Sequence, residues 1–480
     1  MPVISKIKPF FISSLFISSI AFSQAHNVSE GYQKPTDPLV AQNLEQWQDM
    51  KFGLFMHWGT YSQWGIVESW SLCPEDESWT QRKPEHGKSY SEYVKNYENL
   101  QTTFNPTQFN PQKWAEAVKK AGMKYVVFTT KHHDGFAMFD TQQSDYKITS
   151  PKTPFSKNPK SDVTKEIFNT FRKEGFKIGA YFSKPDWHSD DYWWSYFPPK
   201  DRNVNYDPKK YPERWENFKK FTFNQLNVLT SNYGKVDILW LDGGWVRPFH
   251  TIDPKVEWQR TIKVEQDIDM DKIGTMARKN QPGIIIVDRT VSGKWENYVT
   301  PEQAVPEHAL SIPWESCITM GDSFSYVPND NYKTSQKIIE TLVKIISRGG
   351  NYLMNIAPGP NGDYDPIVYE RLQQISAWME KNQSAVFATR SIAPYHEGNY
   401  YYTQSKDGKT LNIFHLDEKT NYESPPTLSF TIPDHFKPKS LKVLGLSNKI
   451  QWKKSGNSIE INLPKERAQL KYSTVIQIVQ

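Results

Sequence analysis

The chain has 480 residues, a formal net charge of +5 and 37% hydrophobic residues, and 14% of its residues are aromatic. This length predicts one large domain followed by a smaller one. Because the net charge is small for the length and no block of Lys and Arg stands out, we do not expect the protein to bind nucleic acid. Cys73 and Cys317 are far apart and form neither a disulfide framework nor a CxxC metal motif.

The first 25 residues have the composition of a signal peptide. Lys6 and Lys8 give a basic start, residues 10–22 form an apolar stretch, and small residues near 21–25 resemble a cleavage site. The apolar stretch is too short to span a membrane, and no later run reaches about 18 apolar residues. We therefore expect an exported protein, periplasmic or secreted, without membrane contact once the signal is removed.

Residues 26–388 alternate short apolar strands with helices of 10–20 residues. Strands are expected at residues 52–58, 124–131, 177–183, 236–242, 284–287, 314–319 and 351–357. Helices are expected at residues 110–122, 162–174, 213–232, 269–280, 332–347 and 366–383. This alternation predicts an α/β domain with a parallel sheet, and about seven strands fit a (β/α) barrel of the TIM type better than a doubly wound sheet. No phosphate-binding glycine motif follows any strand, which argues against a nucleotide cofactor.

Residues 389–480 have a different pattern. Short apolar runs at 411–415, 428–432, 441–446, 459–463 and 475–479 are separated by turn signals such as "KDGKT" and "KSGNS". No long helix is expected between them. The pattern predicts a C-terminal antiparallel β-sandwich of about 90 residues.

The stretch 236–244, "VDILWLDGG", ends a buried strand in an acid and two glycines. Polar residues also lie at or just after the ends of the other strands. They are His57, His132, His133, Tyr181, Asp242, Arg289 and, slightly later, Glu302. Each has an ordinary structural explanation by itself, such as a helix cap for Asp242 or a partner of Asp288 for Arg289. Together they indicate a site, because a barrel collects its catalytic residues at the carboxyl ends of its strands.

Two carboxylates accompanied by His, Tyr and Trp donors suit the hydrolysis of glycosides. One alternative is a metal-dependent barrel hydrolase using His57, His132, His133 and Asp242. Against it, an extended backbone would point the adjacent His132 and His133 to opposite sides. The other alternative is a carbohydrate-binding protein without activity, which would not need two carboxylates.

Several motifs resemble those of the α-L-fucosidases of glycoside hydrolase family 29. They are "MKFGLFMHWG", "AGMKYVVFTTKHHDGFAMF", "IGAYFSKPDW", "NYGKVDILWLDGG", "PWESCITM" and "GGNYLMNIAPGPNGD", and they span about residues 45–385. The resemblance implies a barrel with a C-terminal β-sandwich, and an exo-acting enzyme that releases terminal α-L-fucose from fucosylated glycans. It also implies retention through a covalent intermediate. No cofactor or metal is implied, and the oligomeric state is not indicated.

The resemblance also assigns roles to residues. Asp242 matches the nucleophile, Glu302 is our choice as acid/base, and Glu296 is the alternative. Positions that match fucose-contacting residues are His57, His132, His133, Tyr181 and Trp240, and Arg289 matches the arginine that precedes the acid/base region. Many members have adjacent Glu and Trp after the first strand, whereas this chain has Glu68-Ser69-Trp70; Glu68 and Trp70 are carried over as substrate-binding residues. The insertion at residues 71–100 is expected near the mouth of the site, where it could shape the leaving-group side.

Overall fold

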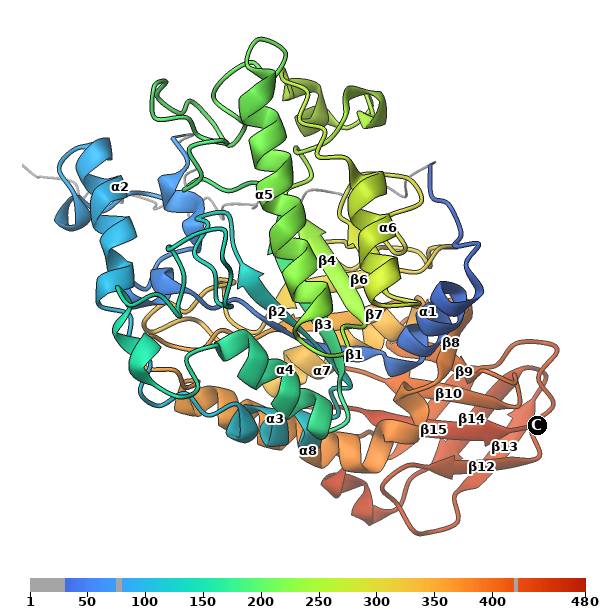
Figure 1. Ribbon diagram of the computed structural model, residues 1–480. Helices are drawn as coiled ribbons and strands as arrows, with labels where there is room; N and C mark the ends of the chain where they lie inside the picture. The colour runs from blue at the N-terminus through green and yellow to red at the C-terminus, as the bar shows by residue number, and fades with distance from the viewer. Residues whose placement is uncertain (1–30, 75–79, 418–421) are drawn as a thin grey trace, which may run out of the picture.

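The computed structural model describes residues 31–74, 80–417 and 422–480. The signal peptide expected at residues 1–25 lies outside the described residues. At the centre of the molecule is a curled sheet of parallel strands surrounded by helices (Figure 1). Its strands are β1 Phe52–Met56, β2 Tyr125–Lys131, β3 Lys177–Ser183, β4 Ile238–Asp242, β5 Ile285–Asp288, β6 Glu315–Thr319 and β7 Asn351–Asn355.

The seven strands follow the order β5-β4-β3-β2-β1-β7-β6 and all neighbours are parallel. Nearly every strand residue is buried, as parallel strands covered on both faces require. All seven expected strands are present, although β1 ends at Met56 and β7 at Asn355, slightly earlier than predicted. His57 therefore follows its strand directly.

The first and last strands of this sheet, β5 and β6, do not pair with each other, so the expected barrel is not closed by regular strands. The irregular segment 295–303 lies between them. It bonds to β5 through Asp288 N to Trp295 O at 2.9 Å, and to β6 through Cys317 N to Pro301 O at 3.1 Å. Pro301 has no N–H to donate and Gln303 has φ 51°, so the segment cannot form a regular ladder. This segment carries both Glu296 and Glu302.

The helices are α1 Pro38–Met50, α2 Tyr90–Glu98, α3 Pro111–Lys120, α4 Val163–Lys173, α5 Pro212–Ser231, α6 Met270–Asn280, α7 Ser335–Ser347 and α8 Pro366–Val386. The six expected helices are confirmed, and α1 and α2 are additional. Side chains of Asn110, Asp162 and Thr334 cap α3, α4 and α7, each by accepting a backbone N–H. Each helix except α2 follows or precedes a strand, so the loops that leave the carboxyl ends of the strands gather at one end of the sheet.

The C-terminal part consists of two antiparallel sheets. The larger contains β8 Thr389–Glu397, β9 Tyr400–Ser405, β10 Thr410–His415, β12 Ser440–Val443 and β15 Thr474–Val479; the smaller contains β11 Thr427–Thr431, β13 Gln451–Ser455 and β14 Ser458–Asn462. Apolar side chains from both sheets, such as Ile476 and Ile461, form one common core. The five expected strands are confirmed; β8, β9 and β13 were not predicted. Most of β8 and β13 is exposed or half-buried, so their apolar signal is weak.

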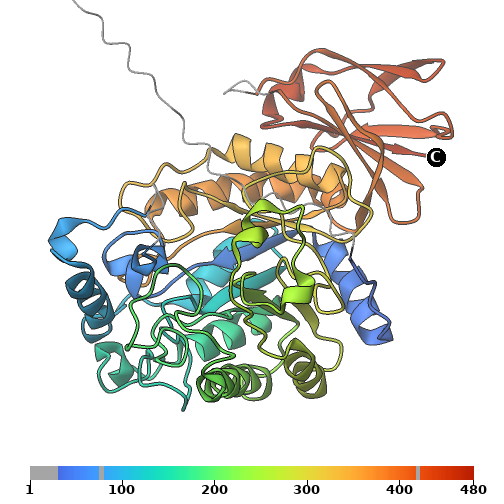
Figure 2. The ribbon, with the colours of Figure 1, turned by 90° about the horizontal axis from the view of Figure 1, so that it is seen from above.

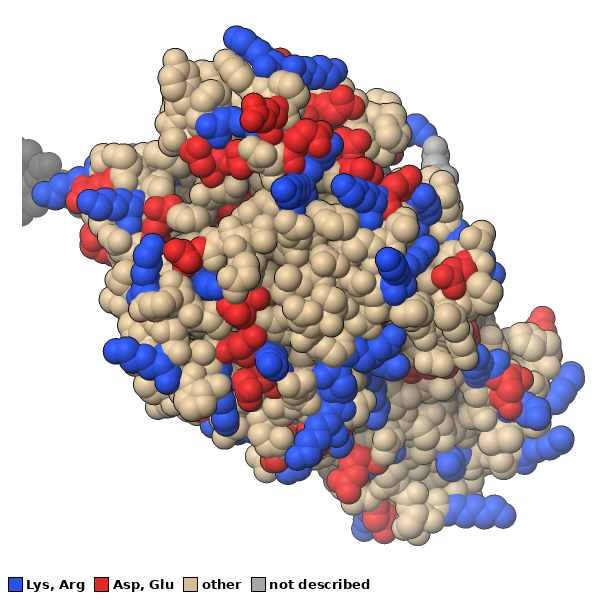
Figure 3. Space-filling model, viewed as in Figure 1, with Lys and Arg blue, Asp and Glu red and all other residues tan. Residues whose placement is uncertain are grey.

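Figure 2 shows these sheets beside one flank of the main body, next to α7 and α8. Arg390 of β8 anchors them to α1 through an ion pair with Asp49, 2.7 Å long. On the face drawn in Figure 3, basic and acidic side chains are interspersed, with acidic ones frequent among the loops at the top. No helix within the described ranges is both long enough and apolar enough to cross a membrane.

Candidate active site

Asp242 is the last residue of β4, and the two glycines after it allow a tight turn. Gly243 has φ 89°, a conformation that side chains disfavour. A Cβ at Gly244 would lie 1.9 Å from Oγ1 of Thr290, so only glycine fits against the loop that follows β5. The helix-cap explanation of Asp242 is wrong, because no helix begins there.

Both carboxylate oxygens of Asp242 accept hydrogen bonds, one from a residue on β3 and one from the residue that follows β5. Tyr181 of β3 donates its hydroxyl to Oδ2 at 2.8 Å, and Arg289 donates Nη1 to Oδ1 at 3.1 Å. Burial disfavours the charged carboxylate, but the guanidinium of Arg289 and the other polar neighbours of Asp242 together outweigh burial and hold the pKa of Asp242 well below its usual range. Asp242 is therefore ionised at neutral pH and fixed in direction by two donors.

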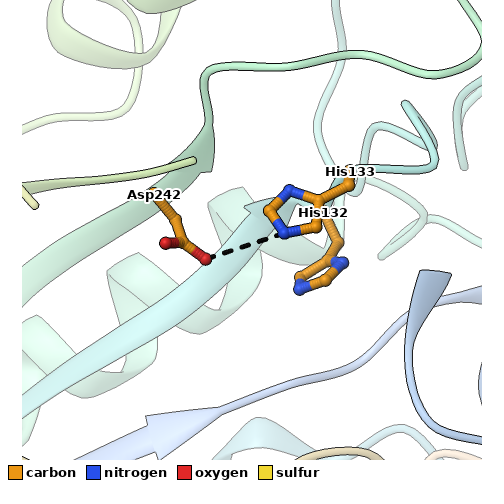
Figure 4. A group of neighbouring side chains, drawn as sticks. All are labelled: His132, His133 and Asp242. Atoms are coloured by element: carbon orange, nitrogen blue, oxygen red, sulfur yellow. Dashed lines mark ion pairs between the residues drawn. The ribbon is translucent and has the colours of Figure 1, made fainter. Parts of the chain in front are cut away.

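His132 and His133 lie on the same side of the site, so the expectation that they point to opposite sides is wrong. Strand β2 ends at Lys131, and the chain turns at once instead of staying extended. The two ring centroids are 4.2 Å apart, and Nε2 of His133 lies 3.8 Å from Oδ2 of Asp242 (Figure 4). The alternation of side chains applies only within a strand, and these residues come after one.

The three imidazoles near Asp242 are uncharged at neutral pH. Burial lowers the pKa of His57 to about 4 and that of His133 to about 3, and it lowers the pKa of His132 well below its usual value. Nδ1 of His57 is hydrogen-bonded to Oδ1 of Asn355 at 2.7 Å, and a hydrogen bond joins Nδ1 of His132 to Ser69. Neutral rings that are held in place can serve as hydrogen-bond donors or acceptors for a polar ligand.

Ligand atoms of His132, His133 and Asp242 all lie within 4.8 Å of one another, a spacing that a metal ion could bridge. The surrounding charges do not suit such an ion. Both oxygens of Asp242 already accept hydrogen bonds, and the cation of Arg289 stands 3.1 Å from one of them. A divalent ion would have to displace the guanidinium or be repelled by it.

Arg289 connects the two candidate catalytic carboxylates. Its Nη1 holds Asp242, and its Nη2 forms an ion pair with Glu302. Burial opposes the charge on Arg289, but the two carboxylates outweigh it and raise the pKa of the guanidinium. The alternative pairing of Arg289 with Asp288 is wrong, because Asp288 pairs with Lys184 at 2.6 Å.

Glu296 and Glu302 lie in different surroundings although they share one segment. The side chain of Glu302 is about one third exposed and faces Arg289. Glu296 is 3% exposed, and its Oε1 accepts the backbone N–H of Thr290 at 2.9 Å. Burial raises the pKa of Glu296 to about 8. Only Glu302 shares a direct partner with Asp242.

Glu68 and Trp70 follow β1 and reach the same site from the side of η2, Ser69–Leu72. Glu68 is 3% exposed, and burial, with the charge of Glu302, raises its pKa to about 8. Trp70 is half-buried and meets the ring of His133 edge-on at 5.1 Å. The loop therefore contributes a neutral carboxyl group and an aromatic wall.

Trp240 is fully buried, and its contacts are with the neighbours of Asp242 rather than with Asp242 itself. Its ring stacks on Tyr181 at 5.4 Å, and the guanidinium of Arg289 lies over it at 5.3 Å. Its Nε1 donates to Glu315 at 3.4 Å. Trp240 thus supports the two residues that hold Asp242.

The structure also brings residues to the site that were not predicted, namely Ser69, Asn355, Trp187 and Trp245. Asn355 ends the apolar strand β7. A polar residue at the end of a buried strand is the signal that identified Asp242, and the same signal could have identified Asn355. Ser69 separates Glu68 from Trp70 and bonds to His132. Trp187 and Trp245 lie within 5.2 Å of His133, measured between ring centroids, and nothing local in the sequence distinguishes them from core tryptophans.

The chain is similar to known proteins of one family. A family model described as alpha-L-fucosidase matches residues 19–384. The chain is 27% identical over 461 residues to tissue alpha-L-fucosidase of Rattus norvegicus, covering 91% of this chain and 90% of the rat protein. It is 28% identical to the human tissue enzyme over 439 residues, 86% of this chain and 84% of the human protein. The solved structure of alpha-L-fucosidase isoenzyme 1 from Paenibacillus thiaminolyticus has a TM-score of 0.73 and 26% identity, covering 92% and 99% of the two chains.

Proposed function

This chain belongs to the α-L-fucosidase family and is a glycoside hydrolase, and we propose that Asp242 and Glu302 carry out its double displacement on terminal α-L-fucosides. One observation supports this assignment above the others: Arg289 binds both carboxylates through neighbouring nitrogens. A shared guanidinium keeps the two carboxyl groups close together, and retaining enzymes need a short separation, about 5–5.5 Å, whereas inverting ones have a longer one.

In the first step, an ionised Asp242 attacks the anomeric carbon as the bond to the leaving group breaks. For this step Glu302 must bind a proton in place of its ion pair with Arg289, and it transfers that proton to the leaving oxygen. The low pKa of Asp242 suits a group that must be ionised, and the two donors on its oxygens fix its direction. The product of this step is a β-linked fucosyl ester and a free alcohol.

In the second step, water attacks the ester from the opposite face. Glu302, now ionised, takes a proton from the water, the ester bond breaks, and Asp242 leaves as a carboxylate. Two inversions give net retention, so the released sugar is α-L-fucose.

The remaining groups bind the sugar. Neutral His57, His132 and His133 can exchange hydrogen bonds with fucose hydroxyls, and Tyr181 holds Asp242 in position. Below pH 8 Glu68 is protonated and can also donate a hydrogen bond. Trp70 offers an aromatic wall to the apolar face of a sugar.

We interpret the curled sheet and segment 295–303 together as a (β/α) barrel in residues 26–388, and the two C-terminal sheets as a β-sandwich in residues 389–480. Hydrogen bonds on both sides of that segment support the first interpretation, and the shared core supports the second. From the composition of residues 1–25, we infer that the protein is exported to the periplasm or secreted.

The test is the hydrolysis of an aryl α-L-fucoside followed by proton NMR of the first-formed sugar. We expect α-L-fucose, which later equilibrates with the β form. If β-L-fucose forms first, the enzyme inverts and Asp242 is misassigned. Binding of fucosylated glycans without turnover would instead support a carbohydrate-binding protein.

A further inference from the structure

The loop between β3 and α5, residues 184–211, is rich in aromatic residues that the proposed chemistry does not use. It leaves the carboxyl end of its strand and rises to the top of the molecule, where α5 begins (Figure 1). It therefore stands at the end of the sheet that holds Asp242. Its rings fall into two groups, one against the site and one facing solvent.

The inner group continues the aromatic wall of the site. Trp70, which meets His133 edge-on, lies 5.5 Å from Trp187 between ring centroids. Trp193 then stacks on Trp187 at 4.9 Å, with the two rings inclined by only 5°. Both Trp70 and Trp193 are half-buried, so this row reaches from the catalytic groups toward solvent.

The outer group begins at the next residue. Trp194 stacks with Tyr196, the centroids being 5.1 Å apart and the rings inclined by 30°. Tyr196 is 72% exposed, the most exposed of the large apolar or aromatic side chains in the described part of the chain. Trp194 directly follows Trp193 in the chain. We call the two groups together the aromatic strip, which consists of Trp70, Trp187, Trp193, Trp194 and Tyr196.

The outer group is held in place by polar contacts. Asn205 accepts the backbone N–H of Trp194 at 2.8 Å and donates to the carbonyls of Trp194 and Phe197. The guanidinium of Arg214 lies 3.9 Å from the ring centre of Trp194 and pairs with Asp190 at 3.0 Å. Rings that are already ordered lose little conformational entropy when a ligand binds, which favours recognition.

A single exposed aromatic residue is common and needs no explanation. Here the exposed Tyr196 stacks on Trp194, and the preceding residue, Trp193, belongs to the row of rings that begins at the catalytic site. Apolar faces of pyranose rings stack on such side chains, while the sugar hydroxyls stay in water. Resting on the function proposed above, we propose that the aromatic strip binds sugar residues of the leaving-group glycan beyond the fucose.

Continuity with the site favours the substrate as occupant over a separate protein partner. Trp70 meets the ring of His133, which lies beside Asp242. A glycan whose fucose lies in the site must leave it past one of the surrounding walls, and the inner group of rings forms one of these walls. The same role for the insertion at residues 71–100 stays a separate prediction from the sequence.

The experiment compares two substrates on Tyr196→Ala: an aryl α-L-fucoside, which has no further sugars, and a fucosylated oligosaccharide with several sugars on the leaving-group side. We expect kcat/KM for the oligosaccharide to fall about 2- to 10-fold, mainly through KM, and the aryl value to stay unchanged. Tyr196→Phe keeps the ring and should behave as wild type. Leu39→Ala, which alters a 51% exposed side chain on α1, is the control.

Equal effects of Tyr196→Ala on both substrates, or none on the oligosaccharide, would overturn the strip as a glycan site. Titration of the defucosylated oligosaccharide into wild type and Tyr196→Ala measures the same contact without catalysis. If wild type cleaves neither substrate but binds this oligosaccharide more tightly than the variant, the strip stands and the proposed function fails.

Discussion

Nη1 of Arg289 lies 3.1 Å from Oδ1 of Asp242, although the two residues are 47 positions apart in the sequence. The other terminal nitrogen of the same guanidinium holds Glu302. Asp242 ends β4 and Arg289 directly follows β5, so the parallel pairing of these strands creates the contact. The segment that bridges β5 and β6 then brings Glu302 to the same group.

Arg289→Lys tests this bridge. A lysine has one ammonium group and cannot hold two carboxylates in a fixed planar geometry. We expect kcat on an aryl fucoside to fall about 100-fold. The lysine ammonium should also stabilise the carboxylate of Asp242 less than the guanidinium does, so the pKa of Asp242 should rise. The acid limb of the kcat/KM profile should then move to higher pH. Arg371→Lys, on the outer helix α8, is the control, and an unchanged acid limb in Arg289→Lys would contradict the role given to Arg289.

Removal of divalent metals should leave activity intact. His132, His133 and Asp242 lie close enough for a shared ion, but Arg289 already provides the positive charge there. We therefore expect full turnover after dialysis against EDTA and no stoichiometric metal by elemental analysis. Activity lost to EDTA and restored by one divalent ion would favour the metal-dependent hydrolase instead.

Most of the fold could be predicted because its strands are buried on both faces and its helices are amphipathic and capped. Periodicity could not predict how the sheet closes. Segment 295–303 contains Pro301 and a residue with positive φ, so it bonds to both neighbours without a strand pattern. Strands β8 and β13 were missed because most of their side chains are exposed or half-buried.

Site residues at strand ends were found because the end of a buried strand is visible in sequence. His132 and His133 show the limit of that approach: their positions were predicted, but not the turn that places both rings beside Asp242. The surroundings that distinguish Glu302 from Glu296 depend on contacts with Arg289 and Thr290. Such contacts across the sheet leave no local pattern.

Glu68 should set an alkaline limit to activity. Its pKa is raised to about 8, so it is protonated at neutral pH and loses that proton as the pH rises through 8. Ionisation removes a hydrogen-bond donor and adds a buried negative charge near Glu302 and Asp242. We expect kcat/KM to decline above about pH 8, and Glu68→Gln, which keeps a donor, to move the decline to higher pH. An unmoved alkaline limb would exclude Glu68 as its source.

Glu296 should make folding stability fall with rising pH. Its folded-state pKa of about 8 lies above the ordinary value near 4.5, so the folded state binds more protons between these values. The stabilisation is complete below the unfolded-state pKa and is lost as the pH rises to about 8. Glu296→Gln resembles the protonated acid and should gain about 2–3 kcal/mol relative to wild type between pH 6 and pH 9. Chemical denaturation at the two pH values measures this, and parallel changes in both proteins would refute it.

The roles of Asp242 and Glu302 can be separated by comparing substrates with different leaving groups and by adding azide. Asp242→Asn should lose on the order of 10³-fold or more of kcat on every substrate, because the nucleophile is needed whatever leaves. Glu302→Gln should lose about 10²- to 10⁴-fold on oligosaccharides, whose alcohols need a proton, and far less on nitrophenyl fucoside. Glu296→Gln is the matched control on the same segment and should show no such dependence.

Azide then reports the stereochemistry of each step. In Glu302→Gln it replaces water without needing a base, attacks the β-linked ester, and should give α-L-fucosyl azide with faster aryl-substrate turnover. In Asp242→Gly no ester can form, so azide entering the vacated space should displace the leaving group directly and give β-L-fucosyl azide. The opposite anomers would therefore identify both residues. If Glu296→Gln shows the leaving-group dependence and the α-azide, Glu296 is the acid/base, and the ion pair between Arg289 and Glu302 only positions the arginine.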